Sequence, residues 1–189
     1  MSKTVLIPIA NGTEEIEAVC IIDTLRRAGA DVTVASAETT LQVTASRGTK
    51  LVADALIGDC AGITFDLIAV PGGMPGAEHL RDSETLTTLL KSQRDADRLY
   101  AAICAAPVVV LQHHGLLAGH TATCHPDFAS RLENPVNVEE RVVTDGNCIT
   151  SRGPGTAIEF ALKLIETLYG AEKARDIGAR MLVTGLTLL

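Results

Sequence analysis

The sequence predicts an α/β fold of one domain, in which a mostly parallel, doubly wound sheet is covered by helices on both faces. Apolar runs of strand length alternate with helical patterns along all 189 residues. Continuous apolar strands of this kind are typical of parallel sheets that are buried on both sides. No linker, repeat or low-complexity segment interrupts the alternation, so we expect residues 1–189 to form a single domain.

A strand, a helix and a second strand open the chain. Their sequences are KTVLIPIA, TEEIEAVCIIDTLRRAG and ADVTVASA, over 3–10, 13–29 and 30–37. An apolar stripe and a glycine stop predict the helix. Thr13 is its expected N-cap, and the dipole at the helix start accounts for Glu14 and Glu15.

The middle and the end of the chain continue the alternation. The pattern over 42–56 predicts a short hairpin followed by a helical turn, and FDLIAVPGG and RLYAAIC are apolar strands. Weaker strands are expected near HTATC, RVVTDG and CITS. We expect helices over 83–97, 107–115, 154–170 and 171–182, the second with a proline in its first turn. The apolar C-terminus MLVTGLTLL is expected to pack on a partner or over the site.

Composition excludes several classes of function. The net charge is −7 with no basic cluster, and aromatic residues make up 3%, which argues against nucleic acid or an anionic membrane as partner. The apolar runs are too short to span a membrane, and the N-terminus resembles a core strand more than a signal peptide. The five cysteines are widely spaced without a zinc pattern, so we expect reduced thiols, no metal and a cytoplasmic protein. Neither GxGxxG nor GxxxxGK[ST] is present, and no cofactor is expected.

The predicted strand ends point to one candidate nucleophile, Cys104. In open parallel sheets, sites form beyond the C-terminal strand ends, so the loops 10–12, 71–73 and 104–106 should converge. Cys104 lies between small residues and just before a helix, as on a strand-to-helix elbow. The helix start would lower the pKa of its thiol. The alternative is an inert cysteine of the core.

Four further positions could act with this thiol. Glu17 lies on an apolar helix face that would raise its pKa, although it could equally lie at the edge of a solvated face. The N–H groups of Gly73 and Ala105 could form an oxyanion hole. His125 could stand at another strand end, or serve a structural role. The GPG at 153–155 could receive an anion or simply start a helix.

The motifs taken together resemble the ThiJ/PfpI superfamily, and most closely its branch that holds the Parkinsonism-associated deglycase. They are Gly12-x-Glu-Glu-x-Glu17, FDLIAVPGG, AAICAAP, TCHP and SRGPGT followed by EFAL, and they extend over essentially the whole chain. The resemblance implies a flavodoxin-like three-layer sandwich with a nucleophile elbow, usually assembled as a homodimer.

The resemblance also implies roles for individual residues. Cys104 would be the reactive elbow cysteine, Glu17 the protonated glutamate that hydrogen-bonds it, and His125 the histidine nearby. Gly73 and Ala105 would supply backbone donors around the cysteine, and Gly72, Arg47 and Pro154 would also belong to the substrate-binding site. Residues that line the site or the dimer contact would be Arg27, Arg47 and the stretch from Arg152 to Pro154.

The implied activity is that of a glutathione-independent glyoxalase and protein deglycase without a cofactor. Its substrates would be methylglyoxal, glyoxal and early glycation adducts, in defence against oxidative and carbonyl stress. The superfamily's protease-like branch has a histidine after the elbow cysteine, whereas Ala105 stands here, which makes peptidase activity unlikely. The alternative function is a redox-sensing stress protein or chaperone that uses oxidation of Cys104.

Overall fold

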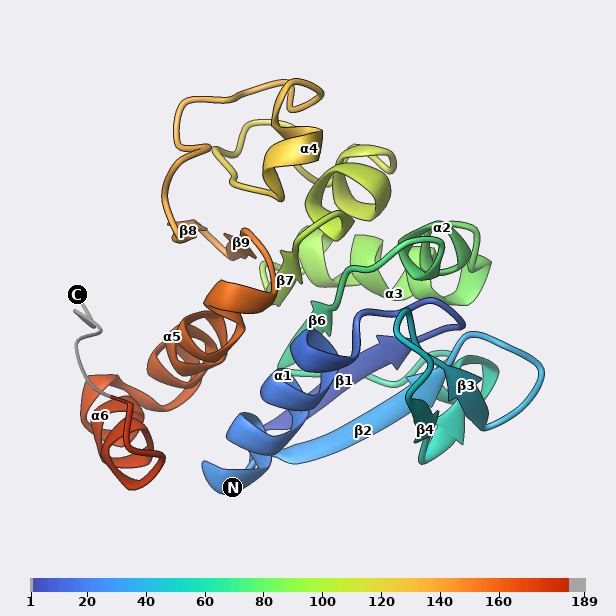
Figure 1. Ribbon diagram of the computed structural model, residues 1–189, viewed down its shortest axis with the longest axis horizontal. Coiled ribbons are helices and arrows are strands. Elements are labelled where there is room, and N and C mark those ends of the chain that lie inside the picture. Colours follow the sequence, from blue (N-terminus) through green and yellow to red (C-terminus); the bar gives the residue numbers. More distant parts are fainter. Residues whose placement is uncertain (1, 184–189) are drawn as a thin grey trace.

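A seven-stranded sheet forms the centre of the molecule (Figure 1). The computed structural model describes residues 2–183, so residues 184–189 of the apolar C-terminus lie outside the described part. The strand order is β5-β2-β1-β6-β7-β9-β8, and β8 pairs antiparallel to β9 while the other neighbours pair in parallel. The predicted mostly parallel α/β class is confirmed. The strands are β1 (Thr4–Ile9), β2 (Asp31–Ser36), β5 (Ala55–Leu56), β6 (Leu67–Val70), β7 (Leu99–Ile103), β8 (Val142–Asp145) and β9 (Cys148–Ser151).

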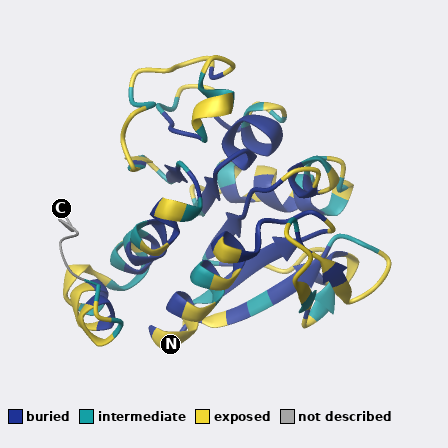
Figure 2. Cartoon of the chain, viewed as in Figure 1, coloured by how far each residue is buried: buried dark blue, intermediate teal, exposed yellow. Residues whose placement is uncertain are grey.

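Helices cover both faces of this sheet and make the fold three-layered. On one side, α1 and α5 pack side by side with α6 against α5, and α2, α3 and a π-helix lie on the other side (Figure 1). The central strands β1, β6, β7 and β9 are buried almost throughout, whereas the outer strands are partly accessible (Figure 2). The helices are α1 (Glu15–Arg27), α2 (Gly76–Arg81), α3 (Glu84–Asp95), the π-helix (Pro107–Gln112), α4 (Pro126–Ala129), α5 (Ala157–Tyr169) and α6 (Ala171–Arg180).

The predicted hairpin lies beside the C-terminal end of β1. Strands β3 (Gln42–Thr44) and β4 (Lys50–Val52) pair antiparallel as a separate two-stranded sheet. A 3-10 helix (Ile57–Cys60) follows, in agreement with the expected helical turn. The N–H of Gly12 donates to the carbonyl of Thr44 at 2.9 Å, which ties the hairpin to the loop after β1.

Two local expectations are wrong. Glu14 is the N-cap of α1, because its carboxylate accepts from the N–H of Glu17, whereas the Thr13 hydroxyl accepts from the N–H of Ala10. The HTATC segment is not a strand, since Thr123 donates its N–H to the hydroxyl of Thr150 and not to a neighbouring backbone. The helix expected to begin with a proline in its first turn is confirmed at Pro107–Gln112, where it is a π-helix. Helix α2 was not anticipated, because six residues carry no readable period.

Candidate active site

Cys104 lies on a strained turn between β7 and the π-helix. Its φ is +66°, a left-handed conformation that costs energy for a residue with a side chain. Its N–H donates to the carbonyl of Ser151 at 3.0 Å, and its carbonyl accepts from the N–H of His125 at 2.9 Å. Two backbone hydrogen bonds therefore hold the elbow, and the side chain is 9% exposed.

The three strand-end loops meet around this cysteine. A Cβ on Gly72 would lie 2.6 Å from the Cβ of Cys104 and 3.0 Å from Oε2 of Glu17, so a larger residue does not fit there. Gly73 has a φ of +91°, and a Cβ on it would collide with the backbone of Gly12 and of Glu14. The N–H of Glu14 donates to the carbonyl of Gly72 at 2.9 Å. Close approach of backbones thus explains both glycines.

The carboxyl group of Glu17 is fully buried beside the thiol. Its Oε2 accepts from the N–H of Gly72 at 2.8 Å, and the thiol of Cys104 acts on the same carboxyl and lowers its pKa. Among the described residues, Oε1 has no hydrogen-bond partner. Burial raises the pKa of Glu17 to about 7, against the lowering effect of the bonds from Gly72 and Cys104. The carboxyl is therefore close to half protonated at neutral pH.

The pKa of the Cys104 thiol does not follow the expectation from the helix start. Burial, and then the negative charge of Glu17, raise this pKa to about 12, although N–H groups of Gly73 and Ala105 donate to the sulfur and lower it. The expected lowering is wrong because the sulfur is enclosed next to a carboxylate. A thiolate at this site requires that the proton of Cys104 pass to the neighbouring carboxylate, so the titrations of the two groups are coupled.

A pocket of about 280 Å³ opens over the sulfur. Arg47 stands at its rim with an exposed side chain, and no carboxylate among the described residues pairs with the guanidinium. Gly72 does not line the pocket but serves the carboxyl of Glu17. The lining residues are Glu14, Ser46, Arg47, Gly73, Met74, Cys104, Ala105, His125, Asp127, Phe128 and Pro154.

His125 lines the same pocket and is the N-cap of α4. Its Nδ1 accepts from the N–H of Asp127 at 3.3 Å and lies 3.6 Å from Oδ2 of that residue. Because Nδ1 accepts, the neutral ring carries its proton on Nε2. The structure thus brings His125 to the pocket of Cys104 without the strand that the sequence predicted before it.

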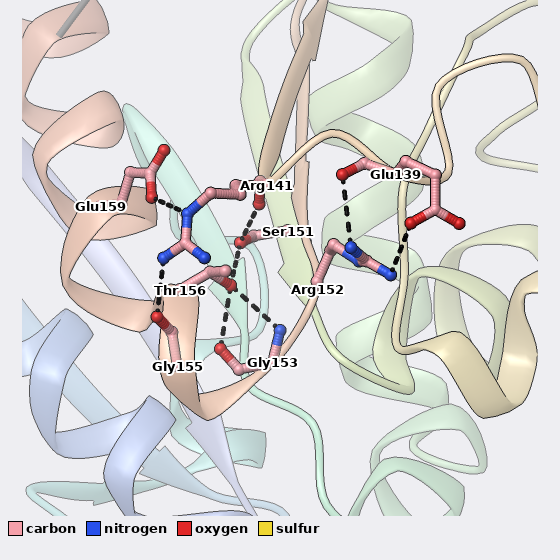
Figure 3. Close-up of polar contacts among 8 residues, drawn as sticks. All are labelled: Glu139, Arg141, Ser151, Arg152, Gly153, Gly155, Thr156 and Glu159. Carbon is pink, nitrogen blue, oxygen red and sulfur yellow. Dashed lines mark hydrogen bonds and ion pairs between the residues drawn. The ribbon is translucent and has the colours of Figure 1, made fainter. Parts of the chain in front are cut away.

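The remaining residues suggested by the resemblance divide between the pocket and the surface. Arg27 ends α1 and pairs with Asp23 at 2.6 Å, away from the residues that line the pocket. Figure 3 shows Arg152 directed at Glu139, with contacts of 3.3 Å to the carbonyl and 3.2 Å to the carboxylate. Of the stretch from Arg152 to Pro154, the proline lines the pocket.

The GPG segment forms a 3-10 turn that leads into α5 (Figure 3). The hydroxyl of Thr156 accepts from the N–H of Gly153 at 3.1 Å and pairs with the hydroxyl of Ser151 at 2.7 Å. Arg141 bonds Glu159 at 2.6 Å and the carbonyl of Gly155 at 2.9 Å. These contacts fix the wall of the pocket at Pro154.

Sequence reasoning missed part of the pocket. Met74, Asp127 and Phe128 lie one or two residues beyond the motifs FDLIAVPGG and TCHP, so those motifs point to a shorter part of the chain than the one that lines the pocket. Ser46 precedes Arg47 on the hairpin turn, and its position became visible only with the hairpin in place. Within the described residues, three or more His, Cys, Asp or Glu side chains do not gather as a metal site, and no helix is long and apolar enough to cross a membrane.

Comparison with known proteins gives one consistent result. The model of the DJ-1/PfpI family matches residues 3–167. Protein DJ-1 homolog A of Arabidopsis thaliana is 51% identical over 96% of this chain, which spans 47% of that relative and 41% of homolog B. The glutathione-independent glyoxalase DJR-1.2 of Caenorhabditis elegans is 38% identical, with 93% of each chain covered. The solved structure of oxidized Toxoplasma gondii DJ-1 has a TM-score of 0.94 and 52% identity, with 97% and 100% of the chains covered.

Because Glu17 and Cys104 share a proton, we expect a defined pH dependence for the rate at which the neutral reagent iodoacetamide alkylates Cys104. Below about pH 7 the pair holds two protons, so the rate should rise about tenfold per pH unit and then level off above the pKa of Glu17. The rate is measured for each cysteine by peptide mass spectrometry. In Glu17→Gln the step near pH 7 should be lost.

Cys60 is the internal control for this profile. It is buried, and burial followed by the charge of Asp59 raises the pKa of its thiol. Its alkylation should keep rising above pH 7. A Cys104 profile that crosses pH 7 without a break would contradict the shared proton.

Proposed function

Since the chain belongs to the DJ-1/PfpI family, we propose that it is a glyoxalase that uses Cys104 and needs neither glutathione nor a cofactor. The observation that carries the proposal is the buried carboxyl of Glu17 next to a thiol on a strained elbow, with two backbone N–H groups at the sulfur. The name of the Caenorhabditis elegans relative, a glutathione-independent glyoxalase, supports the same activity.

The first step is addition of the sulfur to the aldehyde carbon of methylglyoxal. Glu17 as the carboxylate takes the thiol proton while the C–S bond forms, which gives a hemithioacetal. The N–H groups of Gly73 and Ala105, which donate to the sulfur in the resting site, lie where the new oxyanion needs donors. The pKa of Glu17, raised to about 7, suits a group that accepts and returns a proton near neutral pH.

The later steps move protons within the bound hemithioacetal and need no external oxidant. Loss of the C–H proton and reprotonation on the neighbouring carbon pass through an enediol and give a thioester. Glu17 exchanges these protons on one side, and His125, with its proton on Nε2, does so from the pocket wall. Water then cleaves the thioester, which returns the thiol and releases lactate.

The same steps extend to early glycation adducts. Hemithioacetals on cysteine and aminocarbinols on lysine or arginine carry the same carbon. For a deglycase activity, the modified thiol or amine leaves this carbon and takes up a proton as the bond to the sulfur of Cys104 forms, which restores the free side chain. A pocket of about 280 Å³ accommodates a three-carbon dicarbonyl or the tip of a modified side chain. Peptidase activity is not proposed, because Ala105 occupies the position of the dyad histidine.

The assay for the glyoxalase supplies methylglyoxal without glutathione and measures lactate. Cys104→Ser and Glu17→Gln should each lower kcat/KM at least about 100-fold, because one removes the nucleophile and the other its proton acceptor. Cys60→Ser, in a buried thiol that does not line the pocket, is the matched control and should keep the activity. Full lactate formation by Cys104→Ser would refute the proposal.

A second candidate function is redox sensing by the same cysteine. A thiolate that hydrogen bonds stabilise can be oxidised by peroxide to a sulfenic and then a sulfinic acid. Backbone N–H groups of Gly73 and Ala105 surround the sulfur of Cys104 and can hold the added oxygens. The name of the similar Toxoplasma gondii structure, oxidized DJ-1, supports this chemistry in a relative.

To test for oxidation, the protein is treated with a small excess of hydrogen peroxide, and the oxygen added to each cysteine is measured by peptide mass spectrometry. Cys104 should gain oxygen before the other four cysteines, because its proton can pass to Glu17 at neutral pH. Glu17→Gln should slow this oxidation but not that of Cys60. Equal oxidation of Cys104 and the buried Cys148 would count against a sensor.

We also place the protein in the cytoplasm, where it would limit carbonyl and oxidative stress. All five cysteines are unpaired, which suits a reducing compartment. A chaperone role would follow from oxidation of Cys104 if that event exposed apolar surface, so it belongs with the redox-sensing function.

Homodimerisation is proposed through the outer face of α1. Ile16 and Val19 are 53% and 46% exposed, and Cys20 lies beside them at the spacing of one helix face. Ile158 of the adjacent α5 is 39% exposed. An apolar stripe of this kind on a folded surface is typical of contact with another chain.

Val19→Asp should turn the dimer into a monomer, because a charge would be buried without a partner at the interface. Light scattering after size exclusion measures the mass. Val52→Asp, which changes an exposed apolar residue of the hairpin, is the control and should remain dimeric. A monomeric wild-type protein at micromolar concentration would contradict the assembly.

A further inference from the structure

The three glutamates at the start of α1 have three different partners. Glu14 caps the helix by accepting from the N–H of Glu17 at 2.8 Å, and Glu17 faces Cys104. The sequence predicts for Glu15 only an interaction with the helix dipole, but its carboxylate points away from the helix and binds the turn between β3 and β4. This contact joins residues that are more than 30 positions apart in sequence.

The carboxylate of Glu15 is held by donors from one short turn. Oε2 accepts from the hydroxyl of Ser46 at 2.9 Å, and the N–H of Arg47 lies 3.0 and 3.1 Å from the two oxygens. The N–H of Thr49 lies 3.4 Å from Oε1. Glu15 is 8% exposed, so these bonds are largely shielded from water.

The ionised form of Glu15 is required for this set of contacts. Burial alone would raise its pKa, but the hydrogen bonds from its own backbone and from Ser46, Thr49 and Arg47 lower it to about 2. A glutamine would turn an NH₂ group toward at least one of these donors. The turn therefore depends on a charged acceptor.

The turn forms part of the wall over Cys104. Ser46 and Arg47 both line the pocket, and the N–H of Ser46 donates to the carbonyl of Thr13 at 2.8 Å. The backbone of Arg47 is fixed by the bonds from its N–H to Glu15. Its guanidinium is not paired with any carboxylate among the described residues. The other charged groups of the lining are engaged elsewhere: Glu14 in the helix cap, and Asp127 beside His125.

We propose that Glu15 is a positioning residue, which fixes the turn 45–49 so that the guanidinium of Arg47 stands at the rim of the Cys104 pocket. There it favours reagents and substrates that carry a negative charge next to the reacting carbon. The inference uses the proposed function only in taking Cys104 as the reacting group.

The test compares two alkylating reagents of equal size, iodoacetate and iodoacetamide, at Cys104. The ratio of their rates reports the charge at the rim and requires no turnover, so it stands apart from the lactate assay. Arg47→Gln should lower the ratio of iodoacetate to iodoacetamide about three- to tenfold. Glu15→Gln should lower it in the same direction, with the iodoacetamide rate unchanged, and Ser46→Ala should also lower the ratio.

A salt titration and a control variant of another carboxylate that accepts a backbone hydrogen bond distinguish a positioning role of Glu15 from a general loss of structure. In the wild type the ratio should fall as sodium chloride is added, and in Glu15→Gln it should be nearly flat. Asp66→Asn is the control, because Asp66 also accepts from a backbone N–H, that of Thr4 at 2.9 Å, but lies at the opposite end of the strands. Its ratio should equal that of the wild type.

Three results would overturn the inference. One is an unchanged ratio in Glu15→Gln while Arg47→Gln lowers it, since the turn would then hold without Glu15. Another is an unchanged ratio in Arg47→Gln, since the guanidinium would then not act on the pocket. Equal loss of both rates in Glu15→Gln would likewise contradict a positioning role.

Discussion

The contact between the Glu17 carboxyl and the Cys104 thiol sets the demands on the rest of the structure. Both groups are enclosed, and burial raises the pKa of each, so the pair holds a proton that neither group readily releases to water. The sulfur becomes reactive when that proton moves to the carboxyl. The site therefore needs a dry enclosure, a short path between the two groups, and hydrogen-bond donors at the sulfur.

The fold supplies these three conditions from separate elements. The start of α1 provides the carboxyl, and the loop after β6 closes over it through Gly72, which has no room for a side chain. The elbow after β7 turns Cys104 toward that carboxyl at the cost of a left-handed backbone. Gly73 and Ala105 then direct N–H groups at the sulfur. The hairpin turn held by Glu15 completes the wall on the substrate side.

The architecture and the position of Cys104 on a strand-to-helix turn could be predicted from the sequence, whereas much of the chemistry of the site could not. Apolar runs such as 65–73 predict buried parallel strands because burial on both faces leaves no polar side. The direction of the Cys104 pKa was missed, since it depends on loops that close around the sulfur and not on the helix that follows it. The role of Glu15 was missed because its partners lie on a hairpin whose placement no local pattern specifies.

The protonation of Glu17 can be followed directly by the carbon NMR signal of its side-chain carboxyl in protein labelled with ¹³C at glutamate. Glu17→Gln identifies the signal by its absence. The account predicts a titration with a midpoint at about pH 7, well above that of ordinary glutamates. A midpoint near 4.5, the ordinary value for glutamate, would contradict it, because Glu17 would then be fully ionised at neutral pH beside the thiol.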